Sequence, residues 1–254
     1  MALAAISAVG VAAFLYPFLL SDVEQTGEGL ARAEDAPLIF ALVLSLALLL
    51  FLLELSQNAL NAKSVSVLAV LIVAAAAMRI PTLVAGASGF YFLVIAGGYV
   101  YGPRLGFLLG AGALFVSAFA TGGFGPWLPF QIYASGWLGM SAGWLGAGLA
   151  TRLCEHRRVE IGLLALFAGA WGFLFGAIMN LWFWPYVAQG ESISWRPGLG
   201  LGETLRHYWA FYVLTSAGWD GFRAAANVAL VLAAGRPVLD LLVRFRDRFQ
   251  VRLG

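Results

Sequence analysis

A stretch of the chain from Leu105 to Thr151 contains no charged residue. It is about twice as long as one membrane-spanning helix, which needs roughly 20 apolar residues. Near its middle, the segment 121–131 (TGGFGPWLPFQ) holds three glycines and two prolines, a composition that cannot continue a helix. We therefore expect two membrane helices joined by a turn at 121–131.

This turn is apolar and aromatic. It contains none of the Asn, Asp and Ser residues that are typical of turns facing water. We expect such a turn to pack into protein or over a ligand, with Trp127 and Gln131 facing the ligand. A tight connection between two helices, without any ligand, is the alternative.

Composition extends the membrane assignment to the whole chain. Of its 254 residues, 61% are hydrophobic and 11% are charged, a balance that soluble domains do not have. The fold class is an all-α integral membrane protein. The apolar N-terminus has no basic region, which indicates a retained helix rather than a secretory signal. Eight transmembrane helices are expected, at about 2–20, 37–55, 64–78, 88–102, 105–120, 130–150, 161–184 and 209–235.

Two parts of the chain differ in composition. Residues 1–60 form a two-helix extension with an acidic linker, and residues 64–254 are rich in glycine and end in a basic tail. Pairs of small residues at four-residue spacing allow helices to approach closely in lipid, and they predict a compact bundle in the second part. These pairs are Gly106/Gly110, Gly139/Gly143 and Gly172/Gly176.

Basic residues are distributed unequally between the two sides of the predicted membrane. With the N-terminus inside, the outside keeps only Arg32, Arg79, Arg196 and Arg206. Because basic residues favour the cytoplasmic side, this predicts cytoplasmic termini and places the turn at 121–131 outside. The cytoplasmic side then collects Lys63, Arg104, Arg152, Arg157, Arg158, Arg236, Arg244, Arg246, Arg248 and Arg252.

Polar residues within the apolar segments are candidate ligand contacts. Asp220, Arg223 and Asn227 share one face of a helix that we expect to begin after Ser216. Ionisable residues in a membrane segment are costly and often functional, although an ion pair that anchors the helix end is the alternative. Asn180, in the seventh segment, either bonds a neighbouring helix or reaches a ligand.

Arg79 and a group of aromatic residues lie at the predicted outer level. Arg79 ends the third segment, where it either contacts a ligand or extends to the membrane surface as an anchor. Aromatic belts are common at this level, but the concentration on one side favours a large, flat ligand. The residues at this level are Trp127, Gln131, Trp182, Trp184, Tyr186, Trp195, Tyr208, Trp209 and Trp219.

Signatures of catalysis and metal binding are weak. The single Cys154 excludes a disulfide framework, and two histidines, His156 and His207, leave little scope for a metal site. The segment 139–143 (GMSAG) matches G-x-S-x-G but lies inside an apolar helix. The sequence has no phosphate-binding loop ending in Lys-Ser/Thr. We expect no cofactor, and any ATP hydrolysis must come from a partner.

From Leu68 to the C-terminus, the chain resembles the substrate-binding S component of an energy-coupling factor (ECF) transporter. The most specific segment is the turn at 121–131. Two extra N-terminal helices depart from the six-helix pattern of this family. The other segments that carry the resemblance are 74–81 (AAAAMRIP), 98–107 (GYVYGPRLGF), 180–185 (NLWFWP), and Asp220, Arg223 and Asn227 ahead of 235–237 (GRP).

The resemblance implies a six-helix bundle, residues 64–235, that captures a micronutrient in outer loops at 79–89, 121–131 and 185–208. It implies a membrane T subunit and two ABC-type ATPases as partners, and no catalysis by this chain. The expected docking face for the T subunit is Ala69, Val73 and Ala77, where the family often has alanine at the middle position. The candidate substrate contacts are Arg79, Trp127, Gln131, Asn180, Trp184, Asp220, Arg223 and Asn227.

The sequence therefore leads to one main hypothesis of function and two alternatives. The main hypothesis is an S component that binds a vitamin or related micronutrient, with cobalamin as the first candidate because the outer face is aromatic. The first alternative is a polytopic membrane enzyme of lipid or prenyl metabolism with Asp220 and Arg223 in its site. The second is a structural subunit without a ligand.

Overall fold

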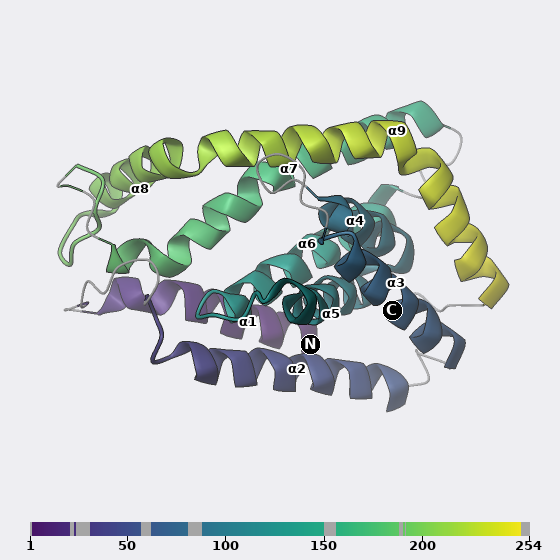
Figure 1. Cartoon of the computed structure of the whole chain (residues 1–254), viewed down its shortest axis with the longest axis horizontal. Coiled ribbons are helices and arrows are strands. Elements are labelled where there is room, and N and C mark those ends of the chain that lie inside the picture. Colours follow the sequence, from purple (N-terminus) through teal and green to yellow (C-terminus); the bar gives the residue numbers. More distant parts are fainter. Residues whose placement is uncertain are drawn as a thin grey trace.

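The computed structural model describes most of the chain as helices (Figure 1). The described residues are 2–20, 23, 31–56, 62–80, 88–149, 156–187, 190 and 192–249. The elements are α1 (Ala2–Leu15), η1 (Tyr16–Leu19), α2 (Ala36–Ser56), α3 (Ala62–Ala77), α4 (Gly89–Tyr101), α5 (Pro103–Thr121), α6 (Leu128–Leu149), α7 (Arg157–Phe183), η3 (Trp184–Tyr186), α8 (Leu201–Thr215) and α9 (Ala217–Phe249).

Some residues named from the sequence lie outside the described ranges. They include Cys154, Arg152 and Arg252, most of the acidic linker after α1, and most of the loop at 79–89. Within the described ranges the protein is all-helical, without β-strands.

Five of the described helical segments are long and apolar enough to cross a membrane, which confirms the all-α class of a membrane protein. Two shorter apolar helices, α3 and α4, accompany them. The count of eight crossings stays a prediction. The five segments are Ala2–Leu19, Ala36–Leu53, Pro103–Thr121, Arg157–Tyr186 and Ala217–Arg248.

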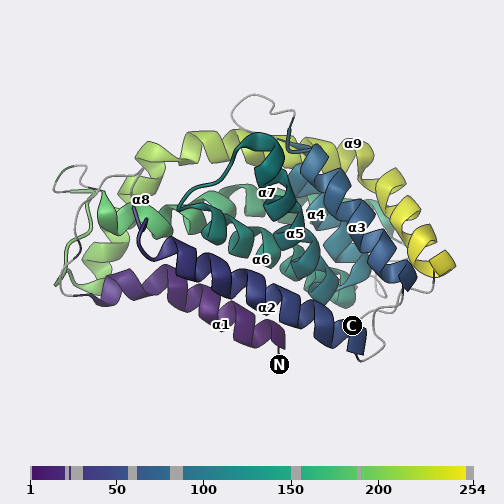
Figure 2. The ribbon, with the colours of Figure 1, turned by 60° about the horizontal axis from the view of Figure 1, so that its bottom comes forward.

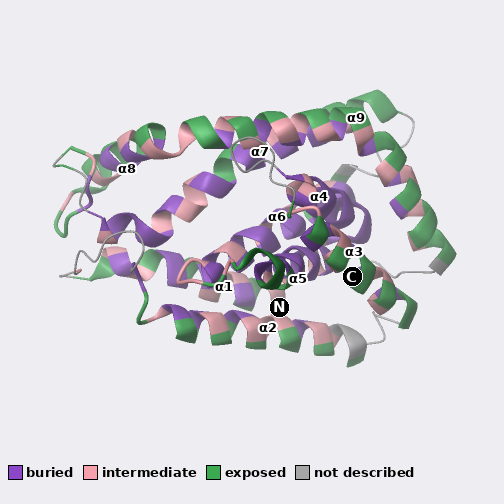
Figure 3. Cartoon of the chain, in the orientation of Figure 1, coloured by how far each residue is buried: buried purple, intermediate pink, exposed green. Residues whose placement is uncertain are grey.

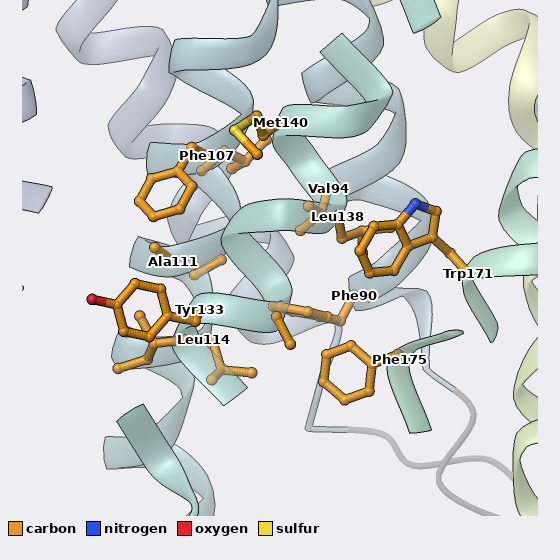
Figure 4. Packing of buried hydrophobic residues seen from close by; sticks show 14 of the residues in the cluster. Phe90, Val94, Phe107, Ala111, Leu114, Tyr133, Leu138, Met140, Trp171 and Phe175 are labelled. Atoms are coloured by element: carbon orange, nitrogen blue, oxygen red, sulfur yellow. The ribbon is translucent and has the colours of Figure 1, made fainter. Parts of the chain in front are cut away.

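The core is built around α4, which is buried along almost its whole length. A helix that is apolar on all sides is stable only when other helices surround it, and α3, α5, α6 and α9 contact α4. Figure 3 shows buried residues concentrated in α4, α5 and α6, with exposed faces on α2, α3 and α9. Side chains from α4, α6 and α7, including Val94, Leu138 and Trp171, lie together in Figure 4.

Glycines permit the closest helix crossings. Gly106 of α5 lies against the backbone of Gly139 of α6, so a Cβ on either glycine would overlap the other helix. Gly172 of α7 lies in the same way against Ala224 of α9. The small-residue pairs found in the sequence therefore mark the contacts of α5 with α6 and of α7 with α9.

The two N-terminal helices share this core. Helices α1 and α2 lie side by side (Figure 2). Helix α1 packs on α6 and α7, and α2 packs on α5 and α6. Ser7 accepts a hydrogen bond from the Trp137 indole at 3.2 Å, and Phe14 packs edge-on against Phe130 at a centroid distance of 5.0 Å. The change in composition near residue 60 is therefore not a boundary between separate cores.

The end of the first linker is held against the start of α6. The Arg32 guanidinium donates to the Asp35 carboxylate at 2.7 and 3.0 Å, and the Tyr16 hydroxyl donates to the same oxygen. Arg32 lies over the Phe130 ring at 4.3 Å, and Phe130 stacks on Trp182 at 5.7 Å. Contacts of the N-terminal extension thus reach Trp182 through Phe130.

The junction between α8 and α9 agrees with the sequence analysis. Helix α8 ends at Thr215 and α9 begins at Ala217, so Ser216 lies between them as expected. The expected end of the last helix at residue 235 is wrong, because α9 continues through Pro237 to Phe249.

Contacts with α4 hold this continuation of α9. The Tyr101 hydroxyl of α4 donates to the Leu242 carbonyl at 3.1 Å, and Leu242 itself is buried. A proline inside a helix removes one hydrogen bond and bends the axis without necessarily ending the helix. Figure 1 shows α9 bending in its C-terminal part.

Candidate functional site

A cavity of about 600 Å³ lies where the turn before α6, the C-terminal half of α7 and the start of α9 meet. This volume falls within the range of about 300–1,000 Å³ that is usual for sites of small organic ligands. Aromatic and polar side chains both contribute to its wall. The lining residues are Trp127, Gln131, Phe175, Gly176, Met179, Asn180, Trp182, Ser216, Trp219, Asp220 and Arg223.

The glycines of the turn position Trp127. Gly122 ends α5 in the left-handed conformation, with φ 62°, which a residue without Cβ adopts at no steric cost. The Trp127 indole lies against Gly125, where a Cβ would overlap the ring. The backbone N–H of Gln131 donates to the Trp127 carbonyl at 3.0 Å, so Trp127 lies immediately before α6 and accepts from its first turn.

The carboxylate of Asp220 is almost completely buried, at 1% exposure, and is engaged on both oxygens. Oδ1 accepts from Arg223 Nη1, and Oδ2 accepts from the Tyr212 hydroxyl at 2.9 Å. The carboxylate lies against Gly176, where a Cβ would overlap it.

The Arg223 guanidinium has a second set of contacts. Nη1 also donates to the Gly172 carbonyl at 3.2 Å. The guanidinium lies near the rings of Tyr91 and Phe175, at 5.6 and 5.3 Å from their centroids, which stabilises the cation. Nε is buried without a hydrogen-bond partner. Arg223 therefore keeps donor capacity beyond its pair with Asp220.

Asn180 contributes a buried amide to the cavity. Its Oδ1 accepts from the Ser216 hydroxyl at 3.0 Å, while Nδ2 is buried without a partner. Asn180 is 4% exposed. A buried amide nitrogen without a hydrogen bond is costly, and this atom has almost no accessible surface, so a ligand acceptor satisfies it only after the side chain shifts.

Arg79 lies behind the cavity wall. Nη1 donates to Ser117 Oγ at 2.9 Å, and Nη2 donates to Gln131 Oε1 at 3.4 Å. Within the described ranges no carboxylate forms a salt bridge with Arg79. Burial lowers the pKa of this guanidinium, but arginine stays charged in proteins at neutral pH.

The structure brings five of the eight candidate contacts together and leaves three away from the cavity wall. Trp127, Gln131, Asn180, Asp220 and Arg223 all line it. Their convergence from three separate segments could not be inferred from their spacing in the sequence.

Arg79 reaches the cavity only through Gln131, and two further candidates lie elsewhere. Trp184 is 1% exposed and packs against Tyr208, with its indole N–H donating to the Ile193 carbonyl at 2.8 Å. Asn227 is 1% exposed and donates to the Ala168 carbonyl at 3.4 Å. The described part of the loop at 185–208 does not line the cavity.

Four lining residues of α7 were not among the candidate substrate contacts, although Trp182 belonged to the outer aromatic group. Phe175, Met179 and Trp182 are three or four residues apart and share one helix face, and Gly176 lies four residues before Asn180. The spacing of Gly176 from Asn180 was the available signal for this residue. Apolar residues at such positions are otherwise typical of lipid-facing surfaces, which is why they did not stand out.

The described residues offer little for metal binding or for a serine nucleophile. They contain no group of three or more His, Cys, Asp or Glu side chains that could hold a metal ion. Ser141, in the G-x-S-x-G match, donates to the Trp137 carbonyl of its own helix at 2.7 Å. The cavity chemistry is that of hydrogen-bond donors and aromatic surfaces.

Comparison of the chain with protein-family models, curated proteins and solved structures gives no match.

Proposed function

We propose that this chain is the substrate-binding S component of an ECF-type importer, which captures a vitamin or related micronutrient. The convergence of Trp127, Gln131, Asn180, Asp220 and Arg223 on one cavity is the observation that supports it most. A wall that combines aromatic side chains with convergent polar groups is typical of sites that bind small organic molecules.

The proposed location is the plasma membrane of a prokaryote, with both termini in the cytoplasm. The excess of basic residues at the opposite ends of the helices from the 121–131 turn supports this orientation. In this orientation the cavity lies at the outer side, because the turn contributes Trp127 and Gln131 to its wall. The protein would then take its substrate from outside the cell.

The cavity volume bears on the choice of substrate. About 600 Å³ suits a molecule of ordinary drug size. Cobalamin, the candidate suggested by the aromatic outer face, is much larger and would have to extend beyond the cavity. We therefore place smaller micronutrients with a ring system ahead of cobalamin.

The buried pair of Asp220 and Arg223 speaks against the alternative of a membrane enzyme. A general base needs a carboxylate that can reach the substrate proton. Both oxygens of Asp220 already accept hydrogen bonds, from Arg223 and Tyr212. This arrangement favours a role in holding the cavity together.

Mass spectrometry of small molecules released from the purified protein tests the proposed function. We expect about one equivalent of a micronutrient from the parent protein. We expect none from Met179→Trp, because the larger indole would occupy part of the space that the ligand needs. The matched control is Leu166→Trp, at a position of α7 that is 70% exposed, which should retain the molecule. Recovery of nothing but lipid from all three proteins would contradict the proposal.

Docking on a T subunit provides a separate prediction. Ala69, Val73 and Ala77 form an exposed stripe on α3, with Val73 60% exposed. An indole does not fit into a close contact between small residues, so Ala77→Trp should abolish co-purification with the T subunit and ATPases while ligand binding is retained. Ala8→Trp, on the exposed face of α1, is the control. Unchanged co-purification of Ala77→Trp would place the docking face elsewhere.

A further inference from the structure

We infer that the substrate of this cavity is a flat ring system that carries an anionic group, either a carboxylate or a phosphate. This inference rests on the proposed function and adds a substrate class to it. Three features of the cavity carry it: an excess of positive charge, unsatisfied hydrogen-bond donors, and aromatic surfaces.

The charged groups at the cavity are two guanidinium groups and one carboxylate. Arg223 and Asp220 line the wall. Arg79 does not line it, but it donates a hydrogen bond to Gln131, which does. Asp220 is neutralised by Arg223 and also accepts from Tyr212. The charge of Arg79 is therefore left without a compensating carboxylate among the described residues, and an anionic ligand would supply one.

Arg79 also fixes the orientation of the Gln131 amide. A guanidinium only donates hydrogen bonds, so the oxygen of Gln131 must face Arg79, as it does at 3.4 Å. The amide nitrogen of Gln131 is then the group left for a ligand. The hydrogen bond from Arg79 polarises the side-chain amide of Gln131. Its N–H group is therefore a stronger hydrogen-bond donor toward the cavity.

The other polar groups of the wall are also donors. Asn180 Nδ2 is buried without a partner, while its oxygen is occupied by Ser216. Arg223 Nε is likewise buried without a partner, and both nitrogens have so little accessible surface that a ligand reaches them only after the side chains shift. A carboxylate or phosphate offers several acceptor lone pairs in a small volume, and hydrogen bonds from charged or polarised donors to such a group are strong.

Aromatic side chains provide the surfaces for a ring. Trp127 belongs to the turn, Trp182 to α7 and Trp219 to α9, and all three line the cavity with Phe175. The Trp182 ring is held in place by stacking on Phe130 at 5.7 Å. Aromatic groups bind flat rings by stacking and edge contacts, so the wall favours a planar ligand.

Replacement of Gln131 by glutamate tests the charge of the ligand. The change is nearly isosteric and gives Arg79 a carboxylate partner, so the melting temperature should not fall. It also places a negative charge against the ligand. At about 5 Å and an effective dielectric constant of about 20, this repulsion weakens the binding of an anionic ligand by about 100-fold or more. Gln131→Met, which removes the hydrogen bond without adding charge, should weaken binding only about 10-fold.

Binding is measured by equilibrium dialysis of the full-length protein in lipid nanodiscs. The probes are two pairs that share a ring and differ in charge, FMN with riboflavin and nicotinate with nicotinamide, together with thiamine as a cation. We expect the anion of at least one pair to bind at least 10-fold more tightly than its neutral partner. The same anion should lose binding in Gln131→Glu, and thiamine should not bind.

Two results would overturn the inference. One is tighter or equal binding of the neutral members, or binding of thiamine that Gln131→Glu strengthens. In that case the cavity still binds a substrate, and the proposed function stands without the anion. The other is that no probe binds and that the purified protein releases a neutral molecule, a cation or no molecule at all. Release of none would overturn the proposed function as well.

Discussion

Replacement of Asp220 by alanine should destabilise the protein by about 3–5 kcal/mol, because it leaves the Arg223 guanidinium buried without its carboxylate. Asp220 is 1% exposed, and its carboxylate is the acidic partner of Arg223 in the structure. The Tyr212 hydroxyl would lose its acceptor as well. The measurement is the midpoint of thermal unfolding in detergent, compared with the parent protein.

A double variant separates the loss of the ion pair from the loss of packing. Asp220→Asn combined with Arg223→Met removes both charges and keeps similar volumes. Because a buried ion pair can be exchanged for uncharged groups at little cost, this variant should melt close to the parent. If Asp220→Ala alone melts like the parent, the pair is solvated rather than buried, and its place in the cavity wall is wrong.

Replacement of Trp127 by alanine should weaken substrate binding by one to two orders of magnitude and leave the melting temperature unchanged. Removal of a stacked tryptophan from a binding site typically costs a few kcal/mol, and each 1.4 kcal/mol is a factor of about ten. Trp127 lines the cavity and rests on Gly125, so its loss empties part of the wall. Affinity and melting temperature are measured on the same preparation.

The matched control is Trp144→Ala, because Trp144 lies on α6 and is 56% exposed. It should change neither quantity. A turn with only a structural role predicts the opposite pattern for Trp127→Ala, with lower stability and lower yield. If the Trp127→Ala protein is folded and binds the substrate as tightly as the parent, the turn at 121–131 is not part of the binding site.

The helices themselves could be predicted from the sequence with good accuracy. The Gly/Pro turn at 121–131, the break at Ser216 and the glycine pairs at helix crossings each depend on local chemistry that the sequence displays. The end of α9 could not be predicted, because the helix beyond Pro237 is held by a hydrogen bond from Tyr101 to the Leu242 carbonyl, between residues 141 apart in the sequence.

The candidate site was predictable only in part. Polar residues in apolar segments stand out, and Gln131, Asn180 and Asp220 do line the cavity. The same reasoning could not separate the aromatic residues that line the cavity from those that do not. Trp182 lines the cavity and Trp184 does not, since two residues along a helix point in nearly opposite directions. Which of the two faces the ligand depends on how α7 is rotated against its neighbours.

The packing of α1 also sets an order of events during synthesis of the chain. Ser7 contacts Trp137 and Met140, which lie 130 and 133 residues later, and a ribosome adds about 5–20 residues per second. Helices α1 and α2 therefore enter the membrane many seconds before α6 and α7 are made, and their first neighbours are lipids. Assembly must then exchange these lipids for protein. The stack of Phe130 on Trp182 cannot form before α7 is made, so this part of the cavity wall is completed late in biogenesis.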